Sequence, residues 1–130
     1  GNVNAQFNLG NMYDSGQGVA QDSYEAVRWY REAADQGDAG AQCNLGAMLC
    51  TGQGVAQNHE KGVQWYRRAA DQGNVNAQFN LGNMYDSGQG VAQDSYEAVR
   101  WYREAADQGD AGAQCNLGDM LCTGQGVAQN

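Results

Sequence analysis

Residues 5–37 read AQFNLGNMYDSGQGVAQDSYEAVRWYREAADQG. In the first part of this stretch, apolar and small residues recur three and four positions apart, and this spacing predicts one helix over roughly 3–15. A second run with the same spacing predicts another helix over roughly 23–35. The residues between the two runs are too few for anything but a turn, so the stretch predicts an antiparallel helix pair.

The residues at the ends of both runs are those that begin and end helices. Asn2 and Asp22 stand where a side chain accepts the first free backbone N–H groups, and Glu25 follows Asp22 at the spacing of a capping box. Gly16 follows the first run and Gly37 the second, where a helix ends most easily in the left-handed conformation. The two helix boundaries are therefore predicted by their caps as well as by periodicity.

The same stretch recurs along the chain with a period of 36 residues. Residues 1–58 and 73–130 are identical except that Ala47 aligns with Asp119, and a shift of 36 leaves more than half of the positions in 1–36 unchanged. A period of this length indicates units that stack and share a core. We predict an all-α, right-handed solenoid of about seven helices, a single domain over 1–130 with repeats 1–36, 37–72 and 73–108 and a partial repeat 109–130.

Composition and charge narrow the classes of partner. The 130 residues carry a net charge of -8 and contain no long apolar run, so we expect neither a membrane-spanning helix nor a nucleic-acid partner held through its phosphates. The first residues show no basic and apolar targeting segment, and the compartment stays open.

The pattern A-x3-LG-x2-Y-x2-G-x-GV-x2-D-x3-A-x2-WY-x2-AA-x-QG, read from Ala5 to Gly37, resembles the Sel1-like repeat, a relative of the tetratricopeptide repeat. It recurs at 41–73, 77–109 and in part at 113–130. The second repeat departs from it at Leu49, Asn58 and Gly62, and a glycine inside a helix is expected to weaken that helix by about 0.5–1 kcal/mol.

Stacked repeats must share their large apolar residues, because one repeat has too few to form a core. Leu45 and Trp65 lie in an internal repeat, so we expect them to contribute more to stability than their counterparts near the ends, Trp29 and Trp101 among them. Gly10 is predicted to let the two helices of a pair approach closely.

No group of residues indicates catalysis or a bound cofactor. His59 is the only histidine and has no candidate partner. Cys43 and Cys50 are seven residues apart on one predicted helix, about 10.5 Å along its axis, which is too far for a disulfide or a shared metal ion, and Cys115 and Cys122 repeat this spacing. We predict four free thiols, no catalytic residues, no metal site and no cofactor.

By resemblance to tetratricopeptide-like stacks, the first helix of each repeat lines a concave groove. Asparagine recurs there in every repeat, and an amide side chain offers both a donor and an acceptor to the backbone of an extended peptide. The alternative that these asparagines cap or link adjacent repeats stays open. The predicted peptide-binding residues are Asn4, Phe7, Asn8, Asn11, Asp14, Asn44, Ala47, Asn76, Phe79, Asn80, Asn83, Asp86, Asn116 and Asp119.

The predicted function is that of a scaffold that binds a peptide or protein segment in this groove. Asp14, Asp86 and Asp119 would make the groove acidic, so we expect the partner to be basic. The alternative is a structural module without a dedicated ligand that associates with itself end to end. An enzyme that uses cysteine or histidine is not expected, because a nucleophile, a base and an orienting group do not converge.

Overall fold

Seven helices of 13 residues each make up the part of the chain that the computed structural model describes, residues 2–127. Gly1, where the first predicted repeat begins, and residues 128–130, where the partial repeat ends, lie outside the described residues. No strand occurs within 2–127. The helices are α1 Val3–Ser15, α2 Ser23–Asp35, α3 Ala39–Thr51, α4 His59–Asp71, α5 Val75–Ser87, α6 Ser95–Asp107 and α7 Ala111–Thr123.

The helix boundaries confirm the predictions from the caps. The Asn2 side chain accepts a hydrogen bond from the backbone N–H of Ala5 at 3.1 Å, and Gly16 ends α1 with a φ of 75°. The Asp22 carboxylate accepts hydrogen bonds from the N–H groups of the first turn of α2, including that of Glu25 at 3.2 Å. Gly18 in the following loop also has a φ of 75°, so the glycines of this loop serve its turns.

The capping box at the start of α2 is only half formed. The backbone N–H of Asp22 donates to the carbonyl of Tyr13 at 3.0 Å, so the Glu25 side chain is not needed there. The Glu25 carboxylate instead pairs with Arg28 at 3.4 Å. The sequence predicted a second bond, from the Asp22 backbone N–H to the Glu25 side chain, and this prediction was wrong. The Tyr13 carbonyl of the preceding helix accepts from that N–H instead.

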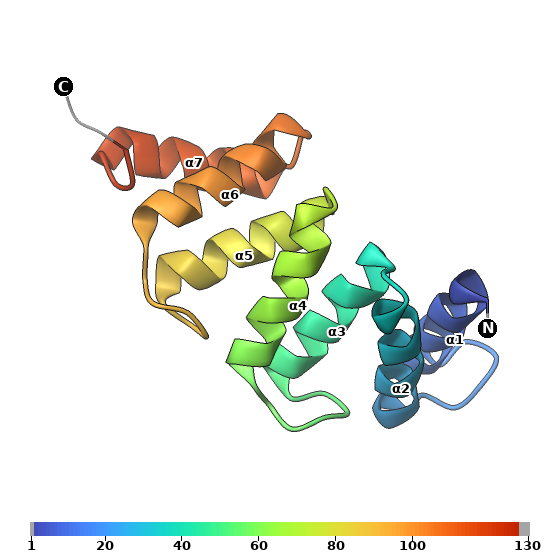
Figure 1. Cartoon of the computed structure of the whole chain (residues 1–130). Helices are drawn as coiled ribbons and strands as arrows, with labels where there is room; N and C mark the ends of the chain where they lie inside the picture. Colours follow the sequence, from blue (N-terminus) through green and yellow to red (C-terminus); the bar gives the residue numbers. More distant parts are fainter. Residues whose placement is uncertain (1, 128–130) are drawn as a thin grey trace.

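Helix pairs α1–α2, α3–α4 and α5–α6 follow one another along a right-handed α-solenoid, and α7 packs on α6 at its end (Figure 1). Helices α1 and α7 lie at opposite ends of the stack. Buried side chains form one core cluster between the first two repeats and a second that runs from α3 to α7. The core is therefore shared between repeats, as the sequence predicted.

Glycines allow the close approach of the helices within a pair. A Cβ atom on Gly10 would lie 2.6 Å from the Tyr30 ring, which confirms the predicted role of this glycine. In the second repeat, a Cβ on Gly62 would overlap the sulfur of Cys50, so Gly62 makes room for the thiol. Helix α4 keeps all 13 residues despite this glycine.

Buried glutamines connect each repeat to the one before it. Gln42 is 1% exposed, and its amide nitrogen donates to the carbonyl oxygen of Ala34 at 3.1 Å. Its amide oxygen accepts a hydrogen bond from Gln72 at 2.8 Å. Gln78 forms the equivalent bonds in the next repeat, at 3.2 Å and 2.7 Å. Because both ends of the buried amide are hydrogen-bonded, the cost of removing it from water is offset at this joint.

The loop between the helices of a pair rests on the preceding repeat. Gly54 has a φ of 67°, and a Cβ there would overlap the carbonyl group of Ser23, the first residue of α2. Gly90 has a φ of 73°, and a Cβ there would lie 2.6 Å from the carbonyl oxygen of His59, the first residue of α4. The loop is therefore part of the contact between repeats as well as a turn.

The burial of the three tryptophans does not follow the order that we expected for their contributions to stability. Trp101, which we expected to matter less than the internal Trp65, is 4% exposed, whereas Trp29 and Trp65 are half-buried. Arg100 covers the Trp101 ring at 4.7 Å and is held by an ion pair with Glu97 at 3.3 Å. This cover alone does not explain the difference in burial, because Arg28 also lies over the half-buried Trp29 ring, at 5.1 Å, and Arg68 over the Trp65 ring, at 4.5 Å.

Candidate functional site

The predicted site residues all lie on the first helices of the repeats, α1, α3, α5 and α7, and we call the surface they form the helix-A face. The structure divides them into an exposed and a half-buried group. The exposed residues are Asn4, Asn8, Asp14, Asn76, Asp86 and Asp119. The half-buried residues are Phe7, Asn11, Asn44, Ala47, Phe79, Asn80, Asn83 and Asn116.

Phe7 and Phe79 belong to the joints between repeats. The Phe7 ring packs against Tyr30 with the ring centroids 6.0 Å apart, and a Cβ on Gly40 of the next repeat would lie 3.3 Å from the Phe7 ring. Phe79 has the same relation to Tyr102, also with 6.0 Å between the ring centroids. These two rings therefore fill space between repeats, which leaves only part of each ring open to a ligand.

A polar network surrounds the Tyr30 hydroxyl on the helix-A face. The hydroxyl donates to the Asn11 side-chain oxygen at 2.7 Å, and the Asn44 side chain of the next repeat lies near it. The pKa of the Tyr30 phenol is raised to about 12, mainly by burial and secondly by the negative charge of Asp14, while the polar Asn44 side chain lowers it. The phenol therefore stays protonated at neutral pH and acts as a donor.

The same network recurs around Tyr102. Its hydroxyl donates to Asn83 at 2.5 Å, and its pKa is raised to about 12 by burial and by Asp86, while the Asn116 side chain lowers it. Asn44 and Asn116 thus each lie near a tyrosine of the preceding repeat. At these two positions the structure supports the interpretation that the recurrent asparagine links repeats.

The centre of the helix-A face is apolar, because the second repeat replaces the polar members of the network. Ala47 and Cys50 stand where the first repeat has the polar Asn11 and Asp14, and Cys43 takes the place of Phe7. Burial raises the pKa of Tyr66, and it raises the pKa of Cys43 to about 11. The pKa of Cys50 is also raised, mainly by burial. The helix-A face therefore has an apolar, thiol-lined centre between two polar tyrosine networks.

The described residues offer no cluster for metal chemistry. Within 2–127 no three side chains among histidine, cysteine, aspartate and glutamate lie close enough together to hold a metal ion. His59 is half-buried at the first position of α4. Of the helices in this part of the chain, none has the length and apolar character to cross a membrane.

All four cysteines are free, as predicted, and they differ in exposure. Cys43 is buried and Cys50 half-buried, whereas Cys115 and Cys122 on α7 are exposed. We expect the folded protein to react quickly with a thiol reagent at Cys115 and Cys122 and slowly at Cys43, whose protonated thiol is shielded. Mass spectrometry after a timed reaction measures this order.

A control with denatured protein checks the thiol count. All four thiols should react once the chain is unfolded without reductant, and the thermal midpoint should be the same with and without reductant. A count of two reactive thiols in the unfolded protein would mean that a disulfide forms and that the helical register of α3 or α7 is wrong.

Sequence reasoning missed the residues that connect the repeats. Gln42 and Gln78 gave one usable signal, because glutamine stands at their place in all four repeats. Gln36 and Gln72 likewise stand at a place that holds glutamine in all three complete repeats. A polar residue that recurs inside an otherwise apolar helix face indicates a satisfied buried amide. The indole nitrogens of Trp29 and Trp101 are buried without a hydrogen-bond partner, and the sequence contains no signal for that.

Comparison with known proteins supports the repeat assignment. The family model for the Sel1 repeat matches the chain four times, at residues 3–38, 39–74, 75–110 and 111–130. These matches have the period of 36 residues found in the sequence, and each begins at the start of a helix. No curated protein matches the chain.

Three solved structures resemble the fold. A protective antigen present in uropathogenic Escherichia coli strains, which displays an SLR fold, is 42% identical with a TM-score of 0.97, over 100% of this chain and 28% of the antigen. A Sel1 repeat protein from Oxalobacter formigenes is 39% identical with a TM-score of 0.94, over 99% of this chain and 53% of that protein. The cysteine rich protein B of Helicobacter pylori, 22% identical with a TM-score of 0.75 and matched over 88% of both chains, shares the fold. The chain thus spans about a quarter and about half of the first two proteins.

Proposed function

The chain belongs to the Sel1 repeat family, whose members are generally non-enzymatic scaffolds for protein interactions, and on that premise we propose that it binds a peptide or protein segment along the helix-A face. The proposal concerns the surface and the kind of ligand. The ligand would lie across α1, α3 and α5, in contact with the exposed amides and carboxylates of α1 and α5 and with the apolar centre on α3.

One observation carries this proposal, namely that the helix-A face presents the same polar side chains twice. Asn4, Asn8 and Asp14 on α1 recur as Asn76, Asn80 and Asp86 on α5. The tyrosine networks beside them fix neighbouring side chains before a ligand arrives, which lowers the entropy cost of binding. An extended segment could therefore meet two equivalent sets of donors and acceptors, with the apolar centre between them.

The charge distribution favours a basic segment. All seven lysines and arginines lie on the second helices α2, α4 and α6, and none lies on α1, α3, α5 or α7. Asp14, Asp86 and Asp119 on the helix-A face therefore have no cation on their own helices. A field of one sign speeds the association of a ligand with the opposite charge.

We expect the double variant Asp14→Asn with Asp86→Asn to weaken binding of a basic peptide and to flatten its salt dependence, because fewer charges attract the ligand. A screen of lysine- and arginine-containing peptides on an array supplies the peptide, and titration calorimetry at several ionic strengths measures the slope.

The matched control is Asp35→Asn with Asp107→Asn, which removes the same charge at exposed ends of α2 and α6. This control should keep the wild-type slope. If both double variants weaken binding equally, the peptide is attracted by the net charge of the whole chain and not by the helix-A face. If neither double variant changes the affinity or its salt dependence, the helix-A carboxylates have no role in binding.

End-to-end self-association is the second candidate, and the exposed side of α7 is the observation that favours it. Leu121 on α7 is 45% exposed, whereas its counterpart Leu49 on α3 is 2% exposed. A second copy seated on α7 would cover this leucine and the exposed thiols beside it. Light scattering over a range of concentrations tests the idea, since a mass that stays constant would contradict it.

A further inference from the structure

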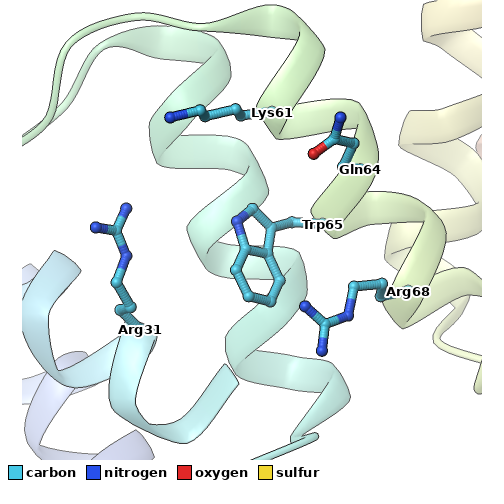
Figure 2. A pocket seen from close by; sticks show the side chains of 5 residues that line it. All are labelled: Arg31, Lys61, Gln64, Trp65 and Arg68. Atoms are coloured by element: carbon cyan, nitrogen blue, oxygen red, sulfur yellow. The ribbon is translucent and has the colours of Figure 1, made fainter. Parts of the chain in front are cut away.

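A pocket of about 310 Å³ lies between α2 and α4, on the side of the solenoid formed by the second helices. Trp65 occupies its middle, with Arg31 of α2 facing it and Lys61 and Arg68 on the same helix as the tryptophan (Figure 2). The guanidinium carbon of Arg68 lies 4.5 Å from the centroid of the Trp65 ring. The pocket therefore combines one aromatic ring with three cationic side chains from two repeats.

The three cations of this pocket have no anionic partner. The ion pairs within residues 2–127 are Arg28 with Glu25 and Arg100 with Glu97, and neither involves the pocket. Three unpaired positive charges stand close together although the whole chain carries a charge of -8. Three positive charges without a partner favour a ligand of negative charge.

The chain contains its own comparison for this pocket, because two of the three cationic positions, those of Lys61 and Arg68, carry the opposite charge in the first and third repeats. Lys61 stands where the first and third repeats have Glu25 and Glu97. Arg68 likewise stands where they have Glu32 and Glu104. The pocket at the next joint, of about 220 Å³, contains Glu104 and Asp71 beside Arg100 and Trp101. The substitutions that make the pocket cationic occur in the second repeat alone.

We propose that the pocket around Trp65 is a second binding site, and that it takes an acidic protein segment whose carboxylates pair with Arg31, Lys61 and Arg68. Guanidinium groups bind carboxylates through two parallel hydrogen bonds, and the ammonium group of Lys61 adds a third point of attraction. Trp65 excludes water from one side of these contacts, which strengthens them. In Figure 2 the indole nitrogen lies on the edge of the ring toward Arg31 and Lys61, where its N–H can donate to the same ligand.

Two features favour a short acidic segment over a nucleic acid. The pocket has room for one or two side chains, and the carboxylates elsewhere on the chain would repel a polyanion. This site is separate from the helix-A face, because it lies on α2 and α4. It also prefers an acidic ligand, whereas the helix-A face favours a basic one. One chain could therefore hold a basic and an acidic partner on different sides.

The test uses the full chain and two fluorescein-labelled peptides, one of alternating glutamate and glycine and one of alternating glutamine and glycine. Fluorescence anisotropy at low ionic strength measures their binding. The pocket variant is Lys61→Glu with Arg68→Glu, which installs the residues that the first and third repeats already carry at these positions, so the fold accommodates them. The control is Arg67→Glu with Arg103→Glu, an equal change of charge at exposed positions of α4 and α6 outside the pocket.

We expect the glutamate peptide to bind the wild-type chain and the control, and to bind the pocket variant at least about tenfold more weakly, since two charged pairs are lost. The glutamine peptide should not bind. Equal losses in the pocket variant and the control, or equal binding of the two peptides, would overturn the proposal. Displacement of the glutamate peptide by an equal concentration of inorganic phosphate would also overturn it, because the site would then take any small anion.

Discussion

Leu45→Ala is expected to lower the free energy of unfolding by about 2–5 kcal/mol, the range for large-to-small changes in a well-packed core. Leu45 is 0% exposed and belongs to the core cluster between the first two repeats. The cavity left by the substitution is enclosed by α2, α3 and α4, so the neighbours cannot collapse into it freely. Urea denaturation followed by circular dichroism measures the loss.

The repeats supply matched controls for this substitution. Leu81 has the same place in the third repeat and is also fully buried, so Leu81→Ala should cost a similar amount. Leu9 is half-buried, so Leu9→Ala removes less buried surface and should cost less. Equal losses at Leu9 and Leu45 would contradict a stability that comes from contacts between repeats.

Gly90→Ala is expected to cost about 2–5 kcal/mol, although it adds only one methyl group to a loop. A left-handed backbone conformation costs a residue other than glycine about 1–2 kcal/mol, and overpacking adds about 1–3 kcal/mol. The new Cβ would lie 2.6 Å from the carbonyl oxygen of His59, which is backbone at the start of α4 and can yield little. The loop would have to leave the preceding repeat, so the joint between repeats would open.

Gly18→Ala separates the two contributions to that cost. Gly18 has a φ of 75°, close to the 73° of Gly90, but its Cβ would meet only the terminal methyl group of Met12, at 3.2 Å. This flexible side chain can move, so only the cost of the left-handed conformation, about 1–2 kcal/mol, should remain. If thermal denaturation shows the same loss for both variants, the contact with His59 contributes nothing to the stability of the stack.

The helices could be predicted from the sequence to the residue, because their signals are local. Asn2 and Gly16 cap α1 by bonds to residues within the same turn, and the period of 36 residues repeats these signals along the chain. The position of Gly10 was also readable, since a glycine amid larger residues on one helix face indicates a close neighbour. The shared core followed from the small number of large apolar residues per repeat.

The contacts between repeats could not be predicted, because they depend on which side chains meet across a joint. Phe7 lies on the predicted binding helix, yet its packing against Tyr30 and Gly40 is decided by the rotation of one helix pair on the next. The same rotation brings Asn44 to the Tyr30 hydroxyl and Arg31 to the pocket at Trp65. A pattern within one repeat contains no information about that angle.

The glutamine joint has a consequence for the growth of the array. Each joint needs one carbonyl oxygen from the repeat before it and one amide from the end of its own repeat, as Gln42 shows with Ala34 and Gln72. A copied unit inserted at any joint would contain its own glutamines, and the preceding repeat would offer the same alanine carbonyl oxygen as an acceptor. Recombination can therefore lengthen or shorten the protein in steps of 36 residues and change its reach, while the neighbouring units keep their structure.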